Sequence, residues 1–113
     1  MAHNVTRIFA EFLADSQWQD IPDEVRNEAK RTILNFVGTA LGGCRDEAVE
    51  LAVRALRPFF GPPQATVIGR SERPDALSAA FLNAISANVL EFDDTHLPTV
   101  IHLAAPVIPR RFV

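Results

Sequence analysis

Residues 74–90 read PDALSAAFLNAISANVL, a run in which alanine and serine are interspersed with large apolar side chains. We expect one helix from about Pro74 to Leu90. Small side chains let neighbouring helices approach closely, so this helix is predicted to lie centrally in a helical bundle. Asn83 and Asn88 are unfavourable inside a helix unless their amides have hydrogen-bond partners. We therefore expect these amides either to bond a buried loop or to orient the acidic residues that follow.

Apolar residues also recur at helical spacing in three earlier segments of the chain. These predicted helices span residues 5–15, 22–43 and 46–56. Asn4 is a suitable N-cap for the first, and Gly42-Gly43 ends the second. Residues 65–68 could form one short strand or an extended segment, but no other segment offers a convincing strand partner. The predicted fold class is therefore all-α, a helical bundle with at most one short strand.

Length, charge and cysteine content limit the classes of function. The 113 residues make at most one domain, and the net charge of -3 comes with scattered basic residues, which predicts no nucleic-acid binding. No apolar run approaches a membrane span, and the N-terminus lacks an apolar signal core. A single cysteine, Cys44, cannot form an internal disulfide or hold an iron–sulfur cluster alone. We expect a cytoplasmic protein without a cofactor.

The end of the sequence indicates a longer protein. Residues 104–109 read AAPVIP and look like the start of another helix, yet the chain ends at Val113. A domain whose polar cluster lies this close to its end has little chain left to close a pocket over it. We therefore expect residues 1–113 to be a fragment truncated at its C-terminus.

Reactive side chains are concentrated in residues 91–102, which read EFDDTHLPTVIH and directly follow the predicted fourth helix. This segment holds three carboxylates, two threonine hydroxyls and two imidazoles. A junction between helix and loop can aim side chains into a cleft while packed turns hold the backbone, as acid/base chemistry on a small polar substrate requires. His96 and His102 are the best candidates for proton transfer, because imidazole titrates near neutral pH.

Each of these groups also has an ordinary structural explanation. Acidic residues beyond a helix end are usually solvated or cap the next helix, and Thr95 is more often a capping hydroxyl than a substrate ligand. A zinc or iron site made by Asp93, Asp94, His96 and His102 is a further alternative. Their spacing matches no strong metal motif, so we expect no metal.

Several of these segments together resemble a known family. NAISANVLEFDDTH at 83–96, followed by IHLAAPV at 101–107, is similar to the signature of the MmgE/PrpD family, which includes 2-methylcitrate dehydratase, cis-aconitate decarboxylase and iminodisuccinate epimerase. NFVGTALGG at 35–43 and ATVIG at 65–69 also resemble family segments. The resemblance implies a homodimer with a large helical domain and a smaller α/β lid domain. Residues 1–113 would be the first part of that helical domain.

The resemblance also implies an activity. Family members are lyases or epimerases that act on di- or tricarboxylates without a metal or iron–sulfur cluster. We predict a metal-independent dehydratase or decarboxylase, a carbon–oxygen hydro-lyase of the 2-methylcitrate dehydratase type, that transfers a proton next to a carboxylate. An epimerase of the same family is an alternative. So is a non-catalytic helical fragment or dimerisation module.

Site residues are carried over by position. Thr95 matches the family threonine, His102 matches the site histidine, and Glu91 falls where an aspartate is usual. We expect His102 to be the general acid/base, assisted by Asp93 and Thr95. The residues expected to bind the substrate are Glu91, Asp94 and His96.

The sequence departs from the family pattern in two places. Glu91 is one methylene longer than the usual acid, and Leu103-Ala104 replaces the Pro-Ser that often follows the histidine. Both departures favour the non-catalytic alternative. Three acids would also repel an anionic substrate, and Lys30 is the only lysine in the sequence. Because the cationic groups must come from elsewhere, we expect the 113-residue chain alone to be inactive.

Overall fold

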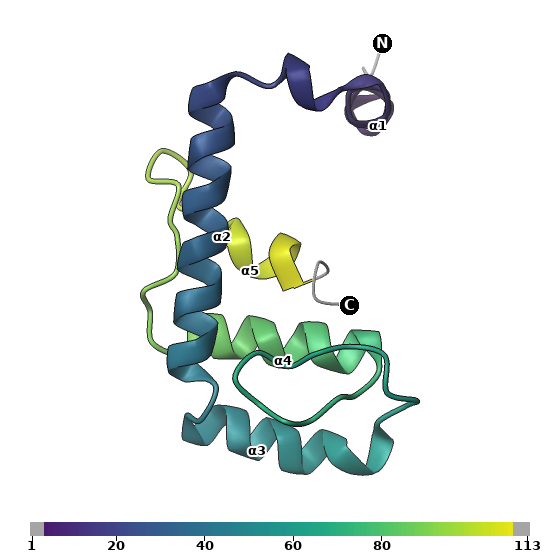
Figure 1. The fold of residues 1–113 in the computed structure, drawn as a ribbon, viewed down its shortest axis with the longest axis vertical. Helices are drawn as coiled ribbons and strands as arrows, with labels where there is room; N and C mark the ends of the chain where they lie inside the picture. The colour runs from purple at the N-terminus through teal and green to yellow at the C-terminus, as the bar shows by residue number, and fades with distance from the viewer. Residues whose placement is uncertain (1–3, 110–113) are drawn as a thin grey trace. The chain divides into compact units, whose positions relative to one another are not determined.

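The computed structural model describes residues 4–109, which form five α-helices, two short 3₁₀ helices and no strand (Figure 1). The predicted all-α class is confirmed. The helices are α1 (Val5–Asp15), η1 (Trp18–Asp20), α2 (Asp23–Gly43), α3 (Glu47–Leu56), η2 (Arg57–Phe59), α4 (Ala76–Asn88) and α5 (Ala104–Val107). The four helices predicted from apolar spacing are therefore present, each with ends within two residues of the prediction.

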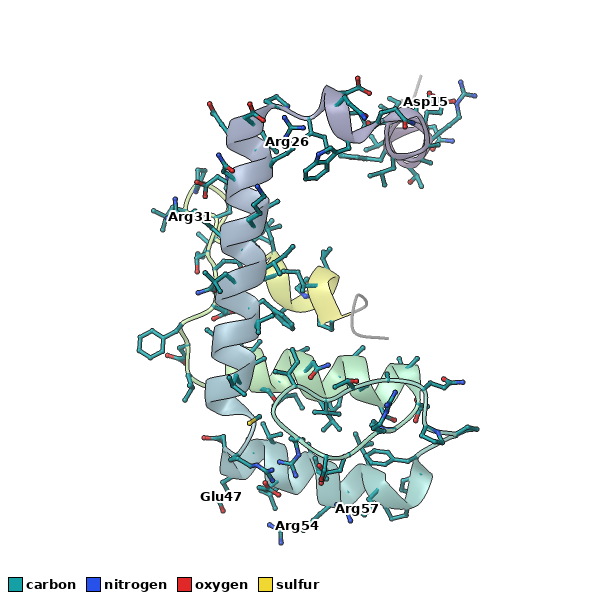
Figure 2. The ribbon with its side chains drawn as sticks, viewed as in Figure 1. Asp15, Arg26, Arg31, Glu47, Arg54 and Arg57 are labelled. Carbon is teal, nitrogen blue, oxygen red and sulfur yellow. The ribbon has the colours of Figure 1, made fainter. Side chains whose placement is uncertain are left out.

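The chain divides into two compact units, residues 1–30 and residues 31–113. In the first unit, the side chain of Asn4 caps α1 by accepting a hydrogen bond from the backbone N of Arg7 at 3.2 Å. The guanidinium of Arg26, labelled in Figure 2, lies 5.2 Å from the centroid of the Trp18 ring. This cation–π contact fastens η1 to the first turns of α2.

The second unit has two hydrophobic clusters, and α4 contributes to both. One cluster joins α3, the loop before α4, and α4 itself; its buried members are Val49, Val53, Ala65, Val67, Ala79 and Leu82. The other joins α2, the loop before α4, α4 itself and the region of α5; its buried members are Phe36, Ala40, Ile68, Ala87, Ala104 and Ile108. The small side chains of α4 thus lie between other elements, as expected for a central helix.

Helix α3 lies beside α4 (Figure 1), and it has one apolar and one charged face. Val49 and Val53 are buried, whereas Figure 2 shows Glu47 and Arg54 on the side of α3 that faces away from α4. Residues 47 and 54 are seven apart, which places them on the same side of a helix with 3.6 residues per turn.

The C-terminal end of α2 approaches α4 closely at Gly43. A Cβ atom at this position would lie 2.2 Å from the carbonyl oxygen of Ser86 and 2.6 Å from Cγ1 of Val89. Both distances are well inside van der Waals contact, so only glycine fits. At Gly38, by contrast, a Cβ atom would meet no described heavy atom within 4 Å.

Asn83 holds the loop that precedes α4. Its side chain is fully buried; Oδ1 accepts a hydrogen bond from the backbone N of Ile68 at 2.8 Å, and Nδ2 donates to the carbonyl of Thr66 at 2.9 Å. Residues 64–67 form no regular secondary structure; besides Asn83, the carbonyl of Pro74 bonds this loop by accepting from the backbone N of Gln64 at 3.0 Å and of Ala65 at 3.1 Å. The bonds of Asn83 confirm the first of the two roles expected for the asparagines.

Within residues 4–109, no helix is both long enough and apolar enough to span a bilayer.

Candidate active site

The polar segment leaves α4 at its C-terminal end and folds back on itself. Within it, the backbone N of His96 donates to the carbonyl of Ile101 at 2.9 Å in an isolated antiparallel bridge. Glu91 and Val100 have positive φ values of 55° and 54°. Left-handed backbone is unfavourable for residues other than glycine, and such strain is often found at functional sites. The fold-back brings residues 93–95 next to His102.

His102 lies at the centre of a small polar cluster. Its Nδ1 atom is 3.1 Å from Oδ2 of Asp93, 3.3 Å from Oγ1 of Thr95 and 3.2 Å from the carbonyl oxygen of Asp94. The side chain of Asp93 is only 5% exposed, whereas that of His102 is 47% exposed. The structure thus brings together the three residues predicted to be catalytic.

The hydrogen-bond partners of Nδ1 indicate which nitrogen of the His102 imidazole carries the hydrogen. An ionised carboxylate and a backbone carbonyl can only accept hydrogen bonds, so Nδ1 must carry hydrogen to bond either of them. The neutral ring then has its lone pair on Nε2. A histidine arranged in this way can take a proton at Nε2 and return it from the same atom.

Two side-chain amides from different helices fix the loop around Asp93. Nδ2 of Asn88, the last residue of α4, donates to Oδ2 of Asp93 at 3.1 Å. Nδ2 of Asn35, on α2, donates to the carbonyl of Phe92 at 3.1 Å. The second role expected for the asparagines, orienting the acidic cluster, therefore belongs to Asn88.

The residues predicted to bind substrate are placed differently from the catalytic three. Oδ1 of Asp94 accepts from the backbone N of Ala104 at 3.0 Å, where α5 begins. Nδ1 of His96 is 2.7 Å from Oγ1 of Thr99, within its own turn. Glu91 is exposed at one of the two strained positions. Asp94 thus reaches His102 through its backbone carbonyl, while His96 belongs to the neighbouring turn.

Sequence reasoning missed Asn35 as part of this region. An asparagine in a helix interior is unfavourable without a partner, and that signal was available at position 35 just as it was at positions 83 and 88. The Oδ1 atom of Asn35 is buried and has no hydrogen-bond partner among the described residues. The amide therefore contributes through its donor, which holds Phe92.

In the described part of the chain, the side chains that could bind a metal are not clustered. Among residues 4–109, no three His, Cys, Asp or Glu side chains are grouped closely enough to hold an ion. The chemistry offered by this region is that of an imidazole, a carboxylate and a hydroxyl.

A second polar cluster is centred on Arg70 and stabilises the fold. The side chain of Arg70 is 2% exposed; its guanidinium bonds Glu50 at 2.6 Å, Glu72 at 3.1 Å and the carbonyl of Cys44 at 2.7 Å. The hydrogen bonds from Arg70 lower the pKa of both glutamates, and their hydrogen bonds in turn raise the pKa of Arg70. These contacts fasten residues 70–72 to α3.

The N-terminus of α4 is capped by Asp75. Its Oδ1 accepts from the backbone N of Ser78 at 3.0 Å, and its Oδ2 accepts from the hydroxyl of Ser78 at 2.7 Å. The bond from that backbone N–H, followed by the bond from the hydroxyl, lowers the pKa of Asp75 to about 2. The helix that carries Asn88 is thus stabilised at the opposite end from the candidate site.

Comparison with known proteins agrees with the resemblance seen in the sequence. The model of the MmgE/PrpD N-terminal domain matches residues 7–112. Cis-aconitate decarboxylase of Aspergillus terreus is 31% identical over 108 residues, which are 96% of this chain and 22% of the relative. Human cis-aconitate decarboxylase is 27% identical over 110 residues, with 96% and 23% covered.

A cis-aconitate decarboxylase-like protein of Aspergillus oryzae is 28% identical over 109 residues, which are 96% of this chain and 23% of the relative. The chain thus spans less than a quarter of the length of the curated relatives it matches. Since the domain model covers nearly all of its residues, the chain belongs to the MmgE/PrpD family.

Proposed function

We propose that the protein is a metal-independent lyase that moves a proton at a carbon next to a carboxylate of a di- or tricarboxylic acid. The observation that carries this proposal is the contact between Nδ1 of His102 and the shielded carboxylate of Asp93 at 3.1 Å. It leaves Nε2 as the proton-transfer atom on a side chain that remains 47% exposed. His102 is the general acid/base, and Asp93 and Thr95 assist it.

One histidine suits both decarboxylation and dehydration. In a decarboxylation, the bond between carbon and carboxylate breaks, carbon dioxide leaves, and the electron pair remaining on carbon takes a proton from the protonated His102. In a dehydration, neutral His102 takes a proton from the carbon next to a carboxylate, and the hydroxyl on the neighbouring carbon leaves as water with a proton taken from solvent. The histidine acts as acid in the first reaction and as base in the second.

Cis-aconitate is the substrate we expect first, because the matched relatives are named for its decarboxylation. Dehydration of 2-methylcitrate, which the sequence signature suggested, is the competing reaction. Epimerisation is a further outcome of the same proton transfer. Glu91, Asp94 and His96 are proposed to contact the substrate.

The charge of the loop places a requirement on the rest of the protein. Glu91, Asp93 and Asp94 would repel an anionic acid, and Lys30 is the only lysine in the sequence. Cationic groups outside this acidic segment are therefore proposed to bind the substrate carboxylates. The proposal includes a homodimer and a cytoplasmic location, and residues 1–113 alone are expected to be inactive.

The test uses the protein at the length that its gene encodes, assayed with cis-aconitate and 2-methylcitrate. We expect His102→Ala to lower kcat about 1000-fold, within the range ascribed to general acid–base catalysis. His96→Ala is the matched variant, and it should raise KM while leaving kcat largely unchanged. Turnover by His102→Ala at the wild-type rate would contradict the assignment of the acid/base.

A non-catalytic helical module is the second candidate, favoured by the departures at Glu91 and Leu103-Ala104. It predicts no turnover of either acid by the wild-type protein. Detection of carbon dioxide or of an unsaturated product above the level of the His102→Ala variant would exclude it.

A further inference from the structure

We propose that Asn88 is a positioning residue that fixes the tautomer of His102 through Asp93. The expected effect on turnover rests on the function proposed above, whereas the effect on the tautomer does not. The geometry that points to this role is the convergence of two donors on one carboxylate oxygen. Oδ2 of Asp93 is 3.1 Å from Nδ2 of Asn88 and 3.1 Å from Nδ1 of His102.

Because both donors bond Oδ2 of Asp93, the orientation of this carboxylate depends on the position of the Asn88 amide. If the carboxylate of Asp93 rotated, it would lose the bond to Asn88 at the same time as the bond to His102. Because the Asp93 side chain is only 5% exposed, water has little access to replace either donor. Hydrogen bonds to a charged acceptor are also the stronger kind, so the arrangement with both donors is favoured.

The amide of Asn88 is attached to a packed helix, α4. Asn88 is the last residue of α4, directly after the buried Ala87 of the hydrophobic core. On the other side of Asp93, Asn35 of α2 holds the carbonyl of Phe92 at 3.1 Å. The backbone at Phe92 is thus held by α2, and the carboxylate of Asp93 is held by α4. Catalytic groups must be positioned to within about 0.5 Å, and two rigid helices can provide this.

The tautomer matters because neutral imidazole has only one N–H. With hydrogen on Nδ1, the base is at Nε2; with hydrogen on Nε2, this atom cannot accept a proton. Without a properly oriented Asp93, the nearest acceptors for Nδ1 are neutral: the carbonyl of Asp94 at 3.2 Å and the hydroxyl of Thr95 at 3.3 Å. These are weaker partners than a carboxylate, so the preference for Nδ1–H should diminish.

The experiment replaces Asn88 with aspartate in the protein at its encoded length, labelled with ¹⁵N-histidine. Asn88→Asp keeps the shape of the side chain but exchanges the donor for an acceptor. We expect the ¹⁵N spectrum of neutral His102 to show a larger fraction with hydrogen on Nε2. We also expect kcat to fall about 100-fold with KM little changed, as for a misplaced catalytic group.

Asn27→Asp is the control, since it makes the same chemical change on an exposed part of α2. It should alter neither the tautomer nor kcat. Asn88→Ala removes the donor without adding charge and should shift the tautomer in the same direction. Because Asn88 is exposed, neither variant at this position is expected to unfold the protein.

The outcomes separate this inference from the proposed function. A tautomer that is the same in wild type, Asn88→Asp and Asn88→Ala overturns the positioning role. A tautomer that shifts in a protein without activity on either acid supports the positioning role, while the proposed function fails.

Discussion

The irregular segments on the two sides of α4 are stabilised in different ways. Residues 60–75, before the helix, insert Ala65 and Val67 into the core, and the fully buried Asn83 bonds their backbone. Residues 89–103, after the helix, are mostly exposed and are held by a few polar contacts around Asp93. Helix α4 is therefore preceded by a loop that is part of the core and followed by a loop that exposes reactive side chains.

The two loops should therefore respond differently to substitution. A loop that is part of the core resists change because each alteration leaves a cavity or an unpaired buried group. A loop that is held by polar contacts at its base can expose an imidazole, and it can also retain strained residues such as Glu91 and Val100. We therefore expect substitutions before α4 to affect mainly stability and substitutions after it to affect mainly activity.

The strongest test of this comparison uses two asparagines of the same helix. Asn83→Ala leaves the buried N–H of Ile68 without a partner and also removes the bond to the carbonyl of Thr66, an exposed residue; together these losses should cost about 3 kcal/mol. Amide hydrogen exchange at residues 65–68 measures this loss directly. Asn88→Ala, the matched change at an exposed position, should alter protection of these amides by less than about 0.5 kcal/mol. Equal effects of the two variants would remove the distinction between the loops.

A second test concerns the contact between α2 and α4. Gly43→Ala would place a Cβ atom 2.2 Å from the carbonyl oxygen of Ser86, so the helices must separate, at a cost of about 2 kcal/mol. Gly38→Ala, in the same helix, meets no described atom within 4 Å and should stabilise the protein by up to about 1 kcal/mol. Urea denaturation gives both values. A Gly43→Ala variant as stable as wild type would show that this approach is looser than the structure indicates.

The helices could be predicted from the sequence because their signals are local. Apolar spacing set the length of each helix, and the polar residues Asn4 and Asp46 lie at the N-caps that the structure shows. The roles of Asn83 and Asn88 could not be assigned in the same way. Both are amides in one helix, and the sequence left two roles open because only the path of each loop decides which groups come within reach.

The contacts of the candidate site depend on loop geometry that has no clear sequence signal. The fold-back that brings Asp93 to His102 needs positive φ at Glu91 and Val100, positions where neither residue is the glycine that usually marks such a turn. Asn35 reaches Phe92 across 57 positions of sequence. The density of polar residues pointed to this segment as the candidate site, but it could not indicate which nitrogen of His102 is held.

The smallest effect is expected at Val100, and it tests whether the exposed loop is strained. A β-branched residue at φ 54° is unfavourable by about 1–2 kcal/mol relative to the usual conformations. Val100→Gly removes this cost but gives the unfolded chain more freedom, so a net stabilisation of about 0.5–1 kcal/mol is expected. Because Val100 is 73% exposed, the substitution sacrifices little burial. Val100→Ala, which keeps a Cβ atom, should not stabilise the loop. Amide exchange at His96, whose N–H bonds the carbonyl of Ile101, reports on both variants. If alanine stabilised the loop as much as glycine, the gain would come from losing an exposed apolar side chain rather than from relief of backbone strain.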